Sequence, residues 1–229
     1  MRTAAAVWLA LAVIAACGRG TSPPPAAEAS ADGSAVGRPA AARPRIVFLG
    51  DSLTAGYGLD ASEAYPSLIQ DRLRLAGLDF EVVNAGVSGD TSAGGLSRID
   101  WSLDGDVRVL VVALGGNDAL RGLGTAELER NLSRTIERAR GRGVRVILAG
   151  MEAPPNLGPA YTSAFRAVYR DLASRHGVAL IPFLLDGVAG DARLNQADGI
   201  HPNAAGSKRV ADLAWPYVER AAREAKHDD

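Results

Sequence analysis

The sequence predicts an α/β fold, a three-layer α/β/α sandwich built on a five-stranded parallel sheet. Two observations support this prediction. From residue 45 onward, short apolar runs typical of buried strands alternate five times with segments of helical periodicity. The run at 107–114 is almost continuously apolar, which is typical of a strand covered on both faces. This alternation favours a parallel sheet with helices on both of its faces.

The first half of the region supplies two strands and two helices. Residues 46–49 form an apolar run that ends at a glycine, and residues 80–83 form the next strand. Residues 64–76 between them are expected to be helical and to end at Gly77. Apolar residues of this helix recur at helical spacing: Leu68, Ile69 and Leu73. Residues 93–103 are expected to form a second helix.

The second half begins with the buried run at 107–114. Thr125 is expected to cap a helix that carries acidic residues in its first turn and ends at Gly141 and Gly143. The remaining elements are expected as a strand at 144–149, a helix at 163–175, a strand at 179–182, and a last helix from Pro202 toward Arg223 with a kink at Pro216. Five such units favour the flavodoxin-like strand order, in which the first and third strands are neighbours.

Composition limits the partners. The chain has 229 residues, a formal net charge of −1, 47% hydrophobic residues and few aromatics, with no basic stripe, so nucleic acid is not an expected partner. Cys17 is the only cysteine, which excludes an intramolecular disulfide. No cysteine–histidine cluster has the spacing of a zinc site, and neither a metal nor a cofactor is expected.

The first 44 residues differ in composition from the rest. Residues 1–16 combine a short basic start with an apolar run too short to span a bilayer, which is typical of a signal peptide. The run leading into Cys17 resembles a bacterial lipobox, whose cysteine carries the lipid; an ordinary signal peptide that happens to contain a cysteine is the alternative. Residues 17–44 are rich in Gly, Ala, Ser and Pro and are expected to act as a tether with a reach of about 30 Å. The folded domain is therefore expected at 45–229.

Four polar blocks follow predicted strands, at the edge where ligands bind in open α/β sheets. They are Gly50-Asp51-Ser52-Leu53, the segment 84–91, Gly115-Gly116-Asn117-Asp118, and the segment 198–203. Ser52 lies where a nucleophile would be useful, although Asp-Ser after a strand is also ordinary turn and helix-cap chemistry.

A serine hydroxyl needs a base to take its proton. Of three histidines, His227 lies in the charged tail and His176 at a helix end, which leaves His201 in a loop after a strand. Asp198 stands three residues before His201, a spacing that lets a carboxylate reach the imidazole. The same Asp198–His201 segment also reads as a capped helix start, with Pro202 in the first turn.

Acyl transfer further needs donors for an oxyanion. The backbone amides of Ser52 and Gly89 and the side-chain amide of Asn117 are candidates. Gly89 could instead serve an ordinary turn, and Asn117 an Asx-turn with Asp118.

Taken together, the four blocks resemble the SGNH (GDSL) hydrolase family, in particular its bacterial multifunctional acyl-CoA thioesterase, lysophospholipase and arylesterase branch. The resemblance covers residue 45 to the last helix. It implies Ser52 as nucleophile, His201 as base, Asp198 as its orienting carboxylate, and Gly89 with Asn117 in the oxyanion hole. It also implies that the loop 120–123 moves on substrate binding. Leu120 and Leu123 in this loop are expected to form the rim of an acyl-chain site, with ordinary loop packing as the alternative, and residues 151–161 are expected to form the other wall.

The expected enzyme cleaves small or lipid acyl esters or thioesters and is a monomer without metal or cofactor. Its expected location is the bacterial cell envelope, anchored through a lipid on Cys17. A carbohydrate O-deacetylase of the same family that acts on cell-surface glycans is the nearest alternative. A flavodoxin-like receiver module would need a lysine after the fifth strand, whereas the only lysines are Lys208 and Lys226 in the last helix. A catalytically silent surface lipoprotein is a third alternative, against which the triad candidates argue.

Overall fold

The computed structural model describes residues 43–227. The predicted signal peptide, Cys17 and nearly all of the tether therefore lie outside the described residues. Within residues 43–227, no helix has both the length and the apolar character that crossing a bilayer requires.

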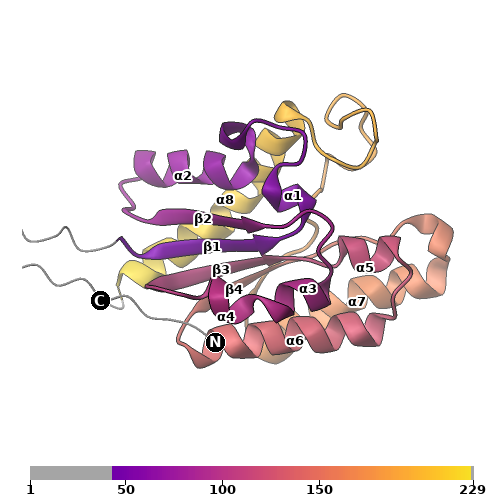
Figure 1. Ribbon diagram of the computed structural model, residues 1–229, viewed down its shortest axis with the longest axis horizontal. Coiled ribbons are helices and arrows are strands. Elements are labelled where there is room, and N and C mark those ends of the chain that lie inside the picture. The colour runs from indigo at the N-terminus through magenta and orange to yellow at the C-terminus, as the bar shows by residue number, and fades with distance from the viewer. Residues whose placement is uncertain (1–42, 228–229) are drawn as a thin grey trace, which may run out of the picture. The chain divides into compact units, whose positions relative to one another are not determined.

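Five parallel strands form one sheet in the order β2-β1-β3-β4-β5, so the predicted strand order is confirmed (Figure 1). The strands are β1 (Arg45–Gly50), β2 (Glu81–Gly86), β3 (Val107–Ala113), β4 (Arg145–Ala149) and β5 (Ala179–Ile181). Strand β3 lies at the centre of the sheet and is almost wholly buried.

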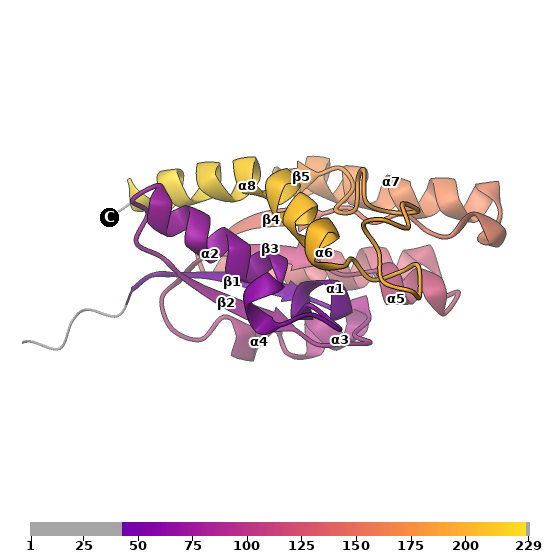
Figure 2. The same cartoon turned by 90° about the horizontal axis from the view of Figure 1, so that it is seen from above.

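Helices cover both faces of the sheet (Figures 1 and 2). They are α1 (Ser52–Ala55), α2 (Tyr65–Leu75), α3 (Ser92–Ser97), α4 (Ile99–Ser102), α5 (Gly116–Leu120), α6 (Thr125–Gly141), α7 (Pro159–His176) and α8 (Ala204–Lys226), with short 3₁₀ turns at Ala61–Glu63 and Pro155–Leu157. Helices α2 and α8 contact each other on one face, while α3, α4, α6 and α7 form the other layer. Pro216 lies inside α8, which continues on both sides of it.

The second strand is longer than predicted. Its register pairs Phe48 with Asn84 and Gly50 with Gly86, so the pairing extends three residues beyond the predicted end at 83. The polar Asn84 is tolerated because its side-chain amide donates to the backbone oxygen of Thr54 at 2.8 Å.

Three predicted helix starts are wrong. Gly124 is the N-cap of α6, which makes Thr125 the first helical residue. Helix α7 begins at Pro159, four residues earlier than predicted, because proline suits the first turn. Asn203 caps α8 by accepting the N–H of Gly206 at 3.0 Å, so Pro202 precedes the helix and instead forms a single β-bridge with Asn195.

The predicted continuous helix at 93–103 is also wrong. It is two short helices, α3 and α4, separated at Arg98, whose φ of −110° and ψ of 8° leave the helical range. The side chain of Arg98 turns toward the sheet and binds groups beside the site, as described below.

Candidate active site

Ser52 is the first residue of α1, at the carboxyl end of β1. Asp51 caps this helix, because its Oδ1 accepts the N–H of Leu53 at 3.0 Å. The helix-cap role, which the sequence analysis gave as the alternative for Asp51-Ser52, is therefore correct for Asp51. It does not describe Ser52, whose hydroxyl faces His201. In Figure 1 the loops that carry the four blocks gather at the end of the sheet where the strand arrows point.

Ser52, His201 and Asp198 form one hydrogen-bonded chain. The Oγ of Ser52 lies 2.9 Å from Nε2 of His201, although the residues are 149 positions apart. The Nδ1 of His201 lies 2.6 Å from Oδ2 of Asp198. Because an ionised carboxylate can only accept, Nδ1 carries the proton in this contact. In the neutral ring, Nε2 is then free to accept the Ser52 proton.

Asp198 is held ionised by its own loop. Its Oδ1 accepts the N–H groups of Ile200 at 2.9 Å and His201 at 3.0 Å. These bonds, with that to the imidazole, lower the pKa of the Asp198 carboxyl to about 2. Asp198 does not cap a helix, since Asn203 has that role.

The loop that carries His201 is fixed by Gln196, which sequence reasoning missed. The backbone N–H of Gln196 donates to the His201 oxygen at 2.7 Å. Its side-chain amide donates to the oxygens of Tyr57 at 2.7 Å and Pro202 at 3.0 Å. One residue thereby ties the histidine loop to the segment after the serine; no sequence signal marks it.

Tyr57 was also assigned no role from the sequence. Its ring lies against the imidazole of His201, with centroids 4.7 Å apart and planes inclined by 42°. The contact restricts rotation of the imidazole and covers one face of it. Tyr57 is nevertheless 54% exposed, so it also forms part of the entrance to the site.

Gly89 and Asn117 line the same cleft as Ser52. Gly89 has a φ of +85°, a conformation that side-chain-bearing residues rarely adopt. The Nδ2 of Asn117 donates to the backbone oxygen of Asp90 at 2.9 Å and lies 3.4 Å from Oδ2 of Asp51. An amide nitrogen carries two hydrogens, and here each has an acceptor, although the bond to Asp51 is long at 3.4 Å.

Asp118, which the sequence analysis named only as the partner of Asn117 in an alternative Asx-turn, anchors a buried network behind these groups. Its carboxylate is 1% exposed and accepts both the hydroxyl of Ser92, at 2.5 Å, and the N–H of Ser92, at 2.8 Å. Asn131 on α6 donates to the same hydroxyl at 3.0 Å. The network joins α3, α5 and α6 beneath Gly89 and Asn117.

The cleft has a volume of about 840 Å³ and predominantly apolar walls. Its apolar lining residues are Leu53, Tyr57, Leu120, Met151, Ala153, Pro154, Pro155, Phe183, Leu185, Ala189 and Ile200. Of the two expected walls, the loop 120–123 contributes Leu120, and the segment 151–161 contributes residues 151–155. Among residues 43–227, no three His, Cys, Asp or Glu side chains are grouped to hold a metal ion.

A second serine–histidine contact lies elsewhere. The Oγ of Ser133 is 2.9 Å from Nε2 of His176. Here the carboxylate, Glu137, binds the serine and not the imidazole. None of the three residues lines the cleft, so this contact lacks both an oriented base and a substrate site.

Asp51 is buried beside the nucleophile. It is 3% exposed, and burial raises the pKa of its carboxyl from 3.8 to about 6, although the N–H of Leu53 acts in the opposite direction. The folded protein therefore holds a proton at Asp51 between pH 3.8 and about 6 that the unfolded chain has released. Stability associated with this group is present below pH 3.8 and falls as the pH rises to about 6.

Asp51→Asn should consequently stabilise the fold at pH 8. The penalty relieved is on the order of 3 kcal/mol at most, which corresponds to a rise in Tm of up to roughly 6–12 °C. The gain should shrink toward zero near pH 4, where the wild-type carboxyl is protonated. Thermal unfolding at both pH values measures it, with Asp104→Asn as an exposed control. A gain that is equal at the two pH values would contradict the argument.

The parallel α/β sheet and the hydrogen-bonded Ser-His-Asp chain at its carboxyl edge are the arrangement of a serine hydrolase. The model of the GDSL-like lipase/acylhydrolase family matches residues 48–209, and the chain belongs to this family.

Named relatives agree with this assignment. The esterase TesA of Pseudomonas aeruginosa is 46% identical over 180 residues, covering 78% of this chain and 90% of that protein. Thioesterase 1/protease 1/lysophospholipase L1 of Escherichia coli K12 is 38% identical over 174 residues, covering 76% and 82%. The crystal structure of AlinE4, an SGNH-hydrolase family esterase, matches with a TM-score of 0.66 and 42% identity, covering 79% and 97%. The chain is accordingly an ester hydrolase with the SGNH fold.

Proposed function

We propose that the enzyme hydrolyses esters and thioesters of short-to-medium unbranched acids, with a loosely specified leaving group, through an acyl-enzyme on Ser52. One observation carries the proposal: the Ser52–His201–Asp198 chain opens onto an apolar cleft of about 840 Å³. The names of the relatives, which include esterase, thioesterase and lysophospholipase, support the same substrate classes.

The mechanism has two halves. Ser52 Oγ attacks the acyl carbon while its proton passes to Nε2 of His201. The tetrahedral oxyanion is held by the N–H groups of Ser52 and Gly89 and by Nδ2 of Asn117. The leaving group departs with the proton from His201. Water then attacks the acyl-enzyme, again losing a proton to His201, and the acid and free Ser52 are released.

Acyl preference follows from the walls of the cleft. Leu120, Met151 and Phe183 offer apolar surface beside the nucleophile. Each buried methylene contributes about 0.8 kcal/mol, so a few more carbons should raise kcat/KM by tens-fold until the groove ends. The mouth is open, which fits leaving groups of different size.

A p-nitrophenyl ester series from acetate to palmitate, run beside acyl-CoA and lysophospholipid, tests this proposal. We expect kcat/KM to rise and then fall with chain length, with activity on more than one leaving group. A strict preference for acetyl, with activity only on acetylated glycans, would replace it with the carbohydrate O-deacetylase alternative.

We further propose that the enzyme is exported and anchored in the cell envelope by a lipid on Cys17. The lipobox-like sequence and the Pro- and Ala-rich tether support this proposal. Cys17→Ala should move the enzyme from the membrane fraction to the soluble fraction or leave an unprocessed precursor. Unchanged processing and fractionation in Cys17→Ala would exclude the anchor.

A further inference from the structure

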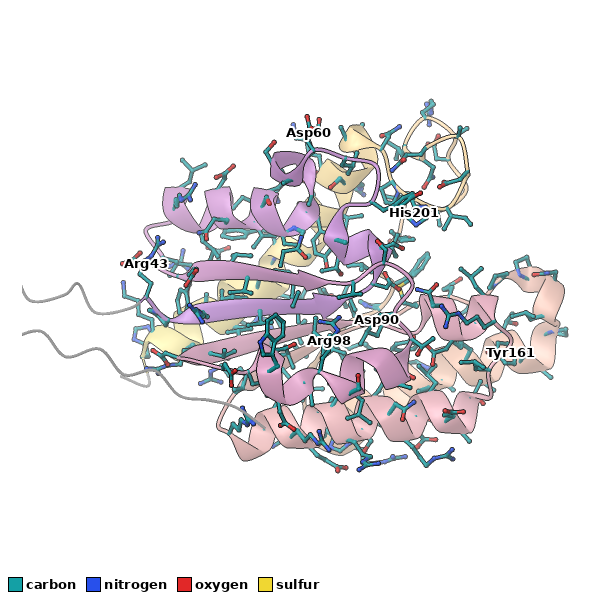
Figure 3. All side chains as sticks on the ribbon, in the orientation of Figure 1. Arg43, Asp60, Asp90, Arg98, Tyr161 and His201 are labelled. Carbon is teal, nitrogen blue, oxygen red and sulfur yellow. The ribbon has the colours of Figure 1, made fainter. Side chains whose placement is uncertain are left out.

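Arg98 joins two segments of the site. It lies between α3 and α4, where the backbone departs from the helix, and its side chain is only 17% exposed. Its Nε donates to Oδ2 of Asp90 at 2.7 Å. Its terminal nitrogen NH2 donates to the backbone oxygen of Gly50 at 2.9 Å. Figure 3 shows Asp90 and Arg98 side by side near the end of the sheet.

Both partners adjoin groups of the proposed mechanism. Gly50 directly precedes Asp51 and Ser52 at the end of β1, and its oxygen also accepts the N–H of Val87 at 3.0 Å. Asp90 directly follows Gly89, and its backbone oxygen accepts Nδ2 of Asn117 at 2.9 Å. The guanidinium group thus links the end of the strand before the nucleophile to the loop that carries Gly89 and accepts the side-chain amide of Asn117.

The residues around Asp90 leave room for its carboxylate beside Arg98 and shelter the ion pair. A Cβ on Gly94 would lie 2.5 Å from Oδ1 of Asp90, so only glycine leaves room for the carboxylate over the start of α3. The carboxylate is 18% exposed, and an ion pair so sheltered is screened less than a surface pair. Arg98 is therefore one of the contacts that hold the loop 87–91, together with Arg121, which donates to the backbone oxygen of Gly89 at 2.7 Å.

We propose that Arg98 is a positioning residue that holds the oxyanion donors Gly89 and Asn117 in register with Ser52. The inference rests on the proposed function, because it assigns Arg98 a part in that mechanism. Arg98 does not touch substrate; it acts through Asp90 and Gly50. Since an oxyanion forms only near the transition state, a displaced donor should lower kcat while KM changes little.

Four variants test this role: Arg98→Met, Arg98→Lys, Asp90→Asn and the double variant. One oxyanion donor is worth about 10²- to 10³-fold in kcat, so a loosened pair in Arg98→Met should cost about 10-fold or more, with KM within about threefold. Arg98→Lys should recover part of the loss, because an ammonium reaches Asp90 but cannot also span to Gly50. The double variant should lose no more than the worse single variant, as expected for coupled residues.

Arg72 supplies a matched control. Its guanidinium also bridges a carboxylate, Asp212, and a backbone oxygen, Ala211, but it joins α2 to α8 away from the cleft. Rates are expressed per active site, counted by fluorophosphonate titration, so that loss of folded protein does not lower them. Arg72→Met should keep wild-type kcat per site. The pH at which kcat/KM rises should be unchanged in Arg98→Met, because the His201–Asp198 contact is untouched.

The inference would be overturned if both Arg98→Met and Asp90→Asn kept a kcat per site within twofold of wild type. It would also be overturned if Arg72→Met lost as much kcat per site as Arg98→Met. If Arg98→Met does not fold, Arg98→Lys and Asp90→Asn decide by the same measure. Mapping of the fluorophosphonate label in the wild-type enzyme distinguishes failure of the proposed function from failure of the positioning role. Labelling of another serine would overturn the proposed function itself, whereas labelling of Ser52 with unaffected Arg98 and Asp90 variants would overturn only the positioning role.

Discussion

Ser52→Ala should lower kcat for ester hydrolysis by about 10⁶-fold, the scale seen when a serine nucleophile is removed from a triad. Alanine leaves the helix cap at Asp51 and the cleft intact but removes the only oxygen within hydrogen-bond distance of Nε2 of His201 in the described part of the chain. KM should change little where it reflects binding alone. Stopped assays with a p-nitrophenyl ester, together with fluorophosphonate labelling and mass-spectrometric mapping, measure both effects.

Ser133→Ala is the matched control for this result. Ser133 also lies 2.9 Å from an imidazole nitrogen, that of His176, yet it does not line the cleft. This variant should keep wild-type activity and label stoichiometry. A Ser52→Ala enzyme that still turned over at an appreciable rate, or a label that mapped to Ser133, would remove Ser52 from the proposed mechanism.

The fold could be predicted because most of its strands contain continuous apolar runs. Strand β3 sits between two covered faces, so its run of hydrophobic residues is almost unbroken and easily recognised. Boundaries were less predictable where a polar residue is satisfied by a distant partner. Asn84 belongs to β2 only because Thr54, 30 positions away, accepts its amide, and no local pattern carries that information.

The helix expected at 93–103 shows a related limit. Helical spacing alone does not indicate that Arg98 gains more from Asp90 and Gly50 than from continuing the helix. Helical periodicity therefore fails to predict the break at Arg98, because tertiary contacts beside the site override the helix propensity of the segment.

The residues of the candidate triad could be predicted from their chemistry and from their positions in loops that follow predicted strands. Ser52 stands directly after β1, whereas Asp198 and His201 lie late in the loop between β5 and α8, and the fold brings the three into one hydrogen-bonded chain. Tyr57 and Gln196 could not be identified, because their contacts depend on the path of the loop between β5 and α8. Asp118 was considered only as the partner of Asn117 in a turn, because nothing local indicates that its carboxylate is buried against Ser92.

Asp198→Asn should lower kcat by about 10⁴-fold, judged from the effect of the same change in serine proteases. The wild-type carboxylate accepts from Nδ1 of His201 at 2.6 Å and so leaves Nε2 unprotonated toward Ser52. An asparagine amide can donate to Nδ1 instead, which places the proton on Nε2 and prevents it from accepting the serine proton. The Asp198 pKa of about 2 keeps the carboxylate ionised at any pH used for assay. The acid limb of the wild-type pH profile should therefore not arise from Asp198.

Asp191→Asn provides the matched control for the Asp198 result. Asp191 lies in the same loop, and its hydrogen bonds with Arg193 also lower its carboxyl pKa to about 2, but its partner is Arg193 and not His201. If loss of a loop carboxylate were the cause, both variants would lose kcat alike. We expect Asp191→Asn to stay within about threefold of wild type, as is usual for an exposed ion pair. Steady-state kinetics from pH 5 to 9 compare the two. An Asp198→Asn enzyme within tenfold of wild type across that range would show that Asp198 does not orient the base.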